Sequence, residues 1–189
     1  MSSNTAAKTP ANTTTKTRMM VQIAMLTAVA EVLMLFDFPL PFAPSFYKID
    51  LSEVPILIGC FAMGPAAGII IEAMKILLNF IISGTVTAGV GELANFAIGC
   101  SMVLPAGLIY RYHKTRKIAV LGMAAGTLVM AAIGGLLNAF VLLPAYAALF
   151  GGMDAIIGMG TAVNKNITSV QSFVLLSVVP FNLVKGVIV

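Results

Sequence analysis

The stretch TAGVGELANFAIGCSMVLPAG, Thr87 to Gly107, is apolar over most of its length, yet it carries two polar side chains near its start. Glu92 and Asn95 are three residues apart and would share one face of a helix. An unpaired charge in hydrocarbon is unfavourable by at least about 2.5–3.5 kcal/mol, so such residues face the protein interior or a ligand. The stretch therefore predicts a membrane helix whose first turn faces a polar site.

The composition of the whole chain is that of a membrane protein. Of its 189 residues, 59% are hydrophobic and 10% are charged, and the mean hydropathy is +1.01. Soluble domains are usually about 45–50% apolar and about 25% charged. We therefore expect one all-α, polytopic membrane domain over residues 19–189. The polar, Thr-rich segment before it, residues 1–18, predicts a disordered tail.

Six apolar runs predict six transmembrane helices. They are Met19 to Phe36, Leu51 to Phe61, Ala66 to Ser83, Leu93 to Tyr110, Ile118 to Leu143 and Ser172 to Val189. The second run is short and must cross as a broken or tilted helix. From Pro180 only ten residues remain, whereas a span needs about 20. Either the last helix begins well before Pro180 or the chain stops inside it; the absence of a basic tail favours an incomplete sixth helix.

The basic residues predict the orientation in the membrane. Seven of the eleven lie near the N-terminus or in the mid-chain loop: Lys8, Lys16, Arg18, Arg111, Lys114, Arg116 and Lys117. Positive segments stay in the cytoplasm, which requires an even number of crossings between these two places. The chain is thus expected to have both ends inside, in a bacterial cell membrane.

In this topology, polar groups from separate segments meet near the outer surface. They are Glu92 and Asn95 in the fourth helix, Asn138 in the fifth, Asn182 and Lys185 in the sixth, and a Pro-rich loop with Phe46 and Tyr47. One interpretation is a polar cluster that only joins helices, such as Glu92 with Lys185. The other is a ligand site, with apolar walls from Phe96, Met102, Phe140 and Phe181 unless these only pack in the core.

The remaining polar residues offer little catalytic chemistry. Glu72 and Lys75 form an i,i+3 pair that can neutralise itself, and Glu31 is interfacial or faces a gate. Cys60 and Cys100 are expected to be small buried thiols, and the single histidine, His113, lies in the basic loop. The sequence has no Walker A motif, no Ser/His pair within the membrane and no metal-ligand spacing. We expect neither an enzyme nor a metal site.

Several of these motifs resemble a known family. GELANF after a Thr/Gly turn, NAFVLLPAY and PFNLVKG are similar to the riboflavin-specific S component of energy-coupling factor (ECF) transporters. The resemblance implies a six-helix subunit that captures riboflavin as cargo, not as a cofactor, on the outer side. A transmembrane coupling subunit and two cytoplasmic ATPases then complete the importer.

The resemblance also implies roles for particular residues. Asn182, Lys185 and Asn138 match ligand-binding positions of the family, Glu92 and Asn95 match its motif, and the first loop covers the site. Ala24 and Ala28 match the small-residue motif that docks on the coupling subunit. By spacing alone, these two alanines are explained equally well by helix packing within the chain.

Three alternatives stay open at this point. The first is an S component for another vitamin, such as thiamine, biotin or folate. The second is an autonomous small-solute carrier. The third is a small lipid-modifying membrane enzyme, which would need converging carboxylates or a His/Ser pair.

Overall fold

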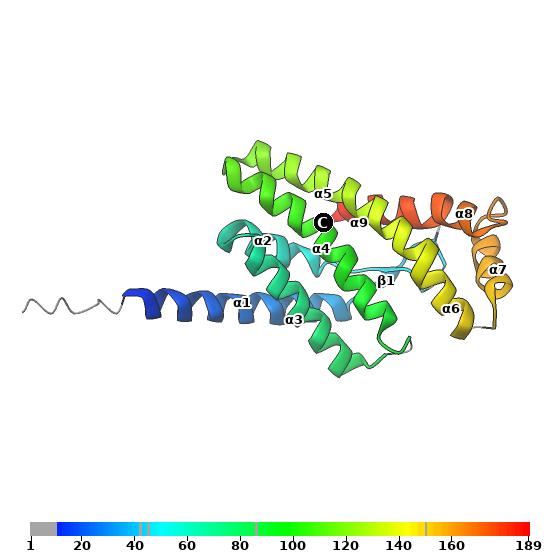
Figure 1. Ribbon diagram of the computed structural model, residues 1–189, viewed down its shortest axis with the longest axis horizontal. Coiled ribbons are helices and arrows are strands. Elements are labelled where there is room, and N and C mark those ends of the chain that lie inside the picture. The colour runs from blue at the N-terminus through cyan, green and yellow to red at the C-terminus, as the bar shows by residue number, and fades with distance from the viewer. Residues whose placement is uncertain (1–10, 42, 45, 86, 150) are drawn as a thin grey trace, which may run out of the picture.

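The computed structural model describes residues 11–189 except 42, 45, 86 and 150, and this part of the chain is almost entirely helical (Figure 1). The helices are α1 (Ala11–Leu35), α2 (Glu53–Met63), α3 (Pro65–Ser83), α4 (Val90–Tyr112), α5 (Arg116–Leu137), α6 (Leu143–Leu149), α7 (Met153–Val163), α8 (Val170–Phe173) and α9 (Val179–Ile188). Two π-helical turns interrupt the later helices, namely η1 (Asn138–Leu142) and η2 (Val174–Val178). The strands β1 (Phe38–Pro39) and β2 (Lys48–Ile49) pair in the loop after α1.

Five helical segments in the described part of the chain are long and apolar enough to cross a membrane. They are Thr15–Leu35, Pro65–Ser83, Val90–Tyr112, Arg116–Leu149 and Val170–Ile188. The expectation of an all-α, multi-pass membrane protein is therefore confirmed. The second predicted run corresponds to α2, whose 11 residues rise only about 16 Å, roughly half the hydrocarbon thickness.

The structure differs from the predicted helix boundaries at three places. Helix α1 begins at Ala11, so residues 11–18 of the expected tail are helical, and residues 1–10 lie outside the described residues. Extending an existing helix needs no new nucleus, which allows polar residues to join it. The residues between the fifth and sixth apolar runs contain most of α6 and all of α7, and the last helical segment begins at Val170, ten residues before Pro180.

Three interruptions of the helices have a local cause. Gly64, between α2 and α3, has a φ of +106°, which side-chain-bearing residues rarely adopt, and Pro65 begins α3 with no N–H to satisfy. The two π-helical turns each end shortly before a proline, Pro144 after η1 and Pro180 after η2. Because proline removes a helical hydrogen bond, a local change of register is a way to continue the helix past it.

Close packing of α4 on α5 depends on two glycines. A Cβ on Gly122 would lie 2.9 Å from the Ala106 carbonyl oxygen, and a Cβ on Gly126 would collide with that of Met102. This small-residue spacing lets two helix backbones approach in a membrane. In Figure 1, α5 follows the upper side of the bundle, and α4 packs against it and continues through the middle.

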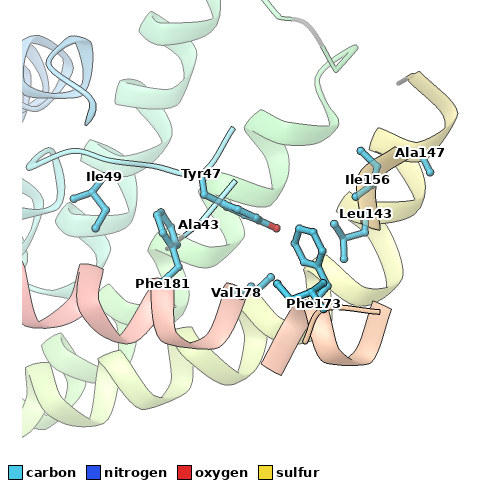
Figure 2. Packing of buried hydrophobic residues seen from close by; sticks show 10 residues of the cluster. Ala43, Tyr47, Ile49, Leu143, Ala147, Ile156, Phe173, Val178 and Phe181 are labelled. Carbon is cyan, nitrogen blue, oxygen red and sulfur yellow. The ribbon is translucent and has the colours of Figure 1, made fainter. Parts of the chain in front are cut away.

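The buried apolar residues form two clusters at different heights. One joins α1 to α5 around Ala30, Ile71 and Met102. The other joins the loop after α1 to the C-terminal helices through Tyr47, Phe173 and Phe181 (Figure 2). The loop is therefore part of the packed structure, and it reaches the same region as α9.

Candidate ligand-binding site

A cavity of about 560 Å³ lies between the loop after α1, the facing ends of α1, α3 and α4, and the helices η1 and α9. Its volume falls within the roughly 300–1,000 Å³ of small-molecule pockets. All eight residues that the sequence suggested for substrate binding line it: Phe46, Tyr47, Glu92, Asn95, Asn138, Phe181, Asn182 and Lys185. The structure thus brings them together from four separate segments; their role in binding stays a prediction.

Lys185 keeps its donors available for a ligand. Its Nζ lies 3.6 Å from Oδ2 of Asp50 and 3.8 Å from Oε1 of Glu53, and its side chain is 8% exposed. These distances are those of ion pairs and are too long for hydrogen bonds. The ammonium is therefore held in place by charge while its N–H groups can still donate to a molecule in the cavity.

Lys75, in contrast to Lys185, is not available to a ligand. Its Nζ lies 2.9 Å from Glu72, 3.2 Å from Glu53 and 3.2 Å from the hydroxyl of Ser52, and its side chain is 1% exposed. An ammonium has three donors; two of them bond Glu53 and Ser52, and the charge is also paired with Glu72, so Lys75 is fully engaged within the protein. The sequence predicted the pair within α3 but missed Glu53, which links Lys75 to Lys185.

Asp50 was also missed, although it fixes the position of Lys185. The residue follows β2 and is buried, and its Oδ1 accepts a hydrogen bond of 2.8 Å from the Ser52 N–H. Burial by itself raises the pKa of the Asp50 carboxyl, but the charges of Lys185 and Lys75 and the hydrogen bonds of Ser52 outweigh it. The pKa is consequently lower than usual, and Asp50 is ionised at neutral pH.

Two buried carboxamides line the cavity, and they differ in which of their amide atoms already bond within the protein. The Nδ2 of Asn182 donates to the Val178 carbonyl at 2.9 Å, and none of the described residues donates to its Oδ1. In Asn138, Nδ2 donates to the Gly134 carbonyl at 2.7 Å, and Oδ1 accepts from the hydroxyl of Tyr47. Asn182 thus offers an unused acceptor to a ligand.

Gly134 makes room for the amide of Asn182. A Cβ at this position on α5 would lie 2.9 Å from Nδ2 and 3.4 Å from Oδ1 of Asn182. The absence of a side chain therefore determines how closely α9 and its carboxamide approach α5.

Aromatic side chains of the loop close one side of the cavity. The ring of Tyr47 lies between Phe181 and Phe173, with centroid distances of 5.2 and 6.3 Å (Figure 2). Phe46 contacts Tyr47 at 4.7 Å and Tyr146 at 5.6 Å. Burial raises the pKa of the Tyr47 hydroxyl, so it stays protonated and donates to Asn138. These rings provide an apolar surface over the polar groups below.

The loop that carries these rings is fastened at its base. Phe38 pairs with Ile49 and Pro39 with Lys48, and an exposed ion pair of 3.0 Å joins Lys48 to Asp37. The loop therefore returns on itself before the chain enters α2.

The first turn of α4 lines the cavity further from the charge cluster. Oε2 of Glu92 accepts a hydrogen bond of 3.2 Å from the Thr87 hydroxyl, which itself accepts from the Gly91 N–H at 3.0 Å. Asn95 is half-buried, one helical turn along the same face. A carboxylate and a carboxamide are thus placed for contacts to hydroxyl groups of a ligand.

Several sequence interpretations need correction. The helix-joining pair proposed between Glu92 and Lys185 is not found in the described structure, where Lys185 pairs with Asp50 and Glu53. Of the four apolar candidates only Phe181 lines the cavity; Met102 is in the bundle core, Phe140 is 76% exposed, and Phe96 lies elsewhere on α4. A helix places only one face at a site, and periodicity alone did not fix that face.

The other singled-out residues are placed as follows. Glu31 is buried, and its Oε1 accepts a hydrogen bond of 3.3 Å from Asn79, a residue that also lines the cavity. Both cysteines are free and buried, as expected. Ala24 and Ala28 are exposed on α1, so no described part of this chain packs over them. Among residues 11–189 outside the four gaps, no cluster of His, Cys, Asp and Glu is suited to a metal ion.

Comparison with known proteins identifies the class of protein. Residues 18–189 match the family described as "ECF transporter, substrate-specific component". The chain belongs to this family, and it is a transport component and not an enzyme.

Its relatives are named for one cargo. The chain is 35% identical over 170 residues to the riboflavin transporter RibU of Staphylococcus aureus (strain TCH60), covering 90% of this chain and 83% of the relative. It is 33% identical over 175 residues to the riboflavin transporter FmnP of Bacillus subtilis (strain 168), covering 92% and 87%. It also resembles a solved S component of a bacterial ECF transporter, with a TM-score of 0.72 and 35% identity, covering 92% of this chain and 89% of that one.

Proposed function

We propose that this chain captures riboflavin at the outer surface of a bacterial cell membrane and delivers it inward as the S component of an ECF importer. The observation that carries this proposal is the convergence of Asn138, Asn182, Lys185 and the loop aromatics on one cavity. The relatives named as riboflavin transporters support the choice of cargo.

The chemistry of the cavity suits a flavin. The isoalloxazine ring is flat and has an amide-like edge, which matches the carboxamides of Asn138 and Asn182. The rings of Phe46, Tyr47 and Phe181 are suited to pack on its faces. Lys185 and Glu92, with Asn95 beside it, are suited to the hydroxyls of the ribityl chain. Riboflavin is then cargo and not a cofactor.

We further propose six membrane segments, with α2 and α3 forming a short and a long segment joined at Gly64, and with the N-terminus in the cytoplasm. The basic residues of the N-terminal segment and of the loop after α4 support this orientation. The cavity then opens to the outside, because Glu92 lies at the other end of α4 from the basic loop.

Transport also needs a source of energy, which the sequence of this chain lacks. We propose that a transmembrane coupling subunit and two ATPases supply it, with Ala24 and Ala28 as the docking point. Both alanines are exposed on one face of α1, next to exposed Met25 and Val29. Small residues at this spacing allow another helix to approach closely.

The test is a titration of the purified protein with riboflavin, followed by quenching of flavin fluorescence. Asn182→Ala and Lys185→Ala should each weaken binding about tenfold or more, because each removes a buried group that is expected to bond the ligand. Lys165→Ala is the matched control, since it removes an equal charge from an exposed loop. Unchanged titrations in both cavity variants, with the protein correctly folded, would remove these residues from the site.

Two measurements separate the alternatives: the same titration with other vitamins, and uptake by the chain alone. Binding of thiamine, biotin or folate in place of riboflavin would assign the chain to another cargo. Uptake into liposomes by this chain alone would support an autonomous carrier, since an S component should require its partners.

A further inference from the structure

A second cavity, of about 440 Å³, lies at the opposite end of the bundle from the ligand site. It is formed by the turn between α2 and α3 and by the last turns of α4. On α4, Arg111 follows Glu92 by 19 residues, which corresponds to about 28 Å along the helix. This distance is close to the roughly 30 Å hydrocarbon thickness of a bilayer, so the second cavity lies at the other membrane surface.

The walls of this cavity are apolar. The rings of Phe61 and Tyr110 contact each other at a centroid distance of 4.7 Å, and both line it. Gly107 lets α4 pack closely against the turn at the base of the cavity, because a Cβ there would collide with Sγ of Cys60 and lie 3.1 Å from Cγ of Pro65. Leu108 lines the cavity and is also 48% exposed, so the apolar wall continues onto the lipid-facing surface of α4.

Two cations complete the cavity. Arg111 and Lys114 line it and are exposed, and no acidic residue is among the residues described as lining it. Neither cation has an ion-pair partner in the described part of the chain, in contrast to Lys48, Lys75 and Lys185. An unneutralised pair of cations beside an apolar hollow is complementary to a molecule that is both anionic and apolar.

We propose that this cavity binds one anionic phospholipid of the membrane, with its phosphate against Arg111 and Lys114 and an acyl chain along Leu108. The position at the membrane surface favours a lipid, since basic pockets between helices bind anionic head groups there. A small soluble anion would leave the apolar wall without a partner, and a neutral lipid would leave the two cations without a counter-charge.

The experiment uses the full chain, purified in micelles with equal amounts of phosphatidylglycerol and phosphatidylcholine, and measures bound lipid by native mass spectrometry. The wild type should retain one phosphatidylglycerol in preference to phosphatidylcholine. Each basic residue at an anionic surface favours association by about fivefold, so R111Q/K114Q should lower this preference by roughly 25-fold. The matched control R116Q/K117Q removes the same charge from the first turn of α5, at the same end of the bundle but outside the cavity, and should keep the preference.

A second variant tests the hollow itself. Ala66 is exposed and lines the cavity, so Ala66→Phe should fill part of it, leave the charges and thermal midpoint unchanged, and abolish retention of the single lipid. Three results would overturn the proposal: equal losses in R111Q/K114Q and R116Q/K117Q, full retention in Ala66→Phe, or displacement of the lipid by inorganic phosphate. The first two indicate general surface charge, and the third indicates a site for a soluble anion.

Discussion

Gly134 provides a test of the binding geometry that does not remove any polar group. In Gly134→Ala the new Cβ would lie 2.9 Å from Nδ2 and 3.2 Å from Cγ of Asn182. Ordinary contacts are about 3.5–4.0 Å, so the carboxamide has to move by roughly half an ångström or more. Its bond to the Val178 carbonyl is now 2.9 Å, close to the usual upper limit of about 3.2 Å, so a shift of this size is expected to weaken it.

The expected effect on ligand affinity follows from this displacement. If the Asn182 amide loses its alignment with riboflavin, one or two hydrogen bonds are weakened, each contributing about 0.5–1.5 kcal/mol. Affinity measured by quenching of flavin fluorescence should fall about tenfold. The thermal midpoint should change little, because the higher helix propensity of alanine, up to about 1 kcal/mol, offsets part of the strain.

The neighbouring residue is the matched control. In Gly135→Ala the nearest atoms would be Cγ1 of Val174 at 3.4 Å and Cγ2 of Val179 at 3.5 Å, both ordinary contacts. Gly135→Ala should therefore bind as the wild type does. Weaker binding in Gly135→Ala than in Gly134→Ala, or wild-type binding in both, would refute the role assigned to Asn182.

Three further predictions follow from other parts of the structure. Ala28→Trp should leave riboflavin titration unchanged and abolish uptake by cells that express the coupling subunit and ATPases; loss of both would indicate a folding role. Lys75→Met should destabilise the protein by about 3–5 kcal/mol, seen as a lower thermal midpoint, because Glu72 and Glu53 lose their shared cation. In the double variant Lys75→Met/Glu72→Gln, part of this lost stability should be recovered. Asp50→Asn should lower the thermal midpoint at pH 7. The folded-state pKa of Asp50 lies below its usual value of about 4, so the stabilisation by its charge is fully present above about pH 4 and is lost as the pH falls through the folded-state pKa. The thermal midpoints of the wild type and Asp50→Asn should therefore converge on acidification. A constant difference would contradict this assignment.

Much of the site could be predicted from the sequence because polar residues are conspicuous in apolar helices. In a membrane segment, a polar side chain cannot be explained by exposure to water. This applies to Asn138, Asn182 and Lys185, and all three line the cavity. Phe140 shows the limit of this reasoning. An aromatic residue is unremarkable in a membrane helix, and its direction depends on the π-helical turn η1, which the sequence did not indicate.

The charge cluster could be predicted only in part, because its members come from different segments. Glu72 and Lys75 are close in sequence and were paired correctly, whereas Glu53 lies on α2, 22 residues before Lys75. Glu53 also follows the Pro-rich loop, where a charge at the water interface is expected. Its burial results from the loop returning into the bundle before α2 begins, which is a tertiary effect.

The two apolar clusters have a consequence for synthesis. The fully buried members of the bundle core lie between Ala30 and Met130, so most of that part can pack while later residues are still being translated. The other cluster joins Tyr47 to Phe173, a separation of 126 residues in the chain. At about 5–20 residues per second, the ribosome needs roughly 6–25 s to make that interval. During this interval the loop is at the bilayer surface without the residues it packs against, so we expect the binding pocket to be the last part of the molecule to fold.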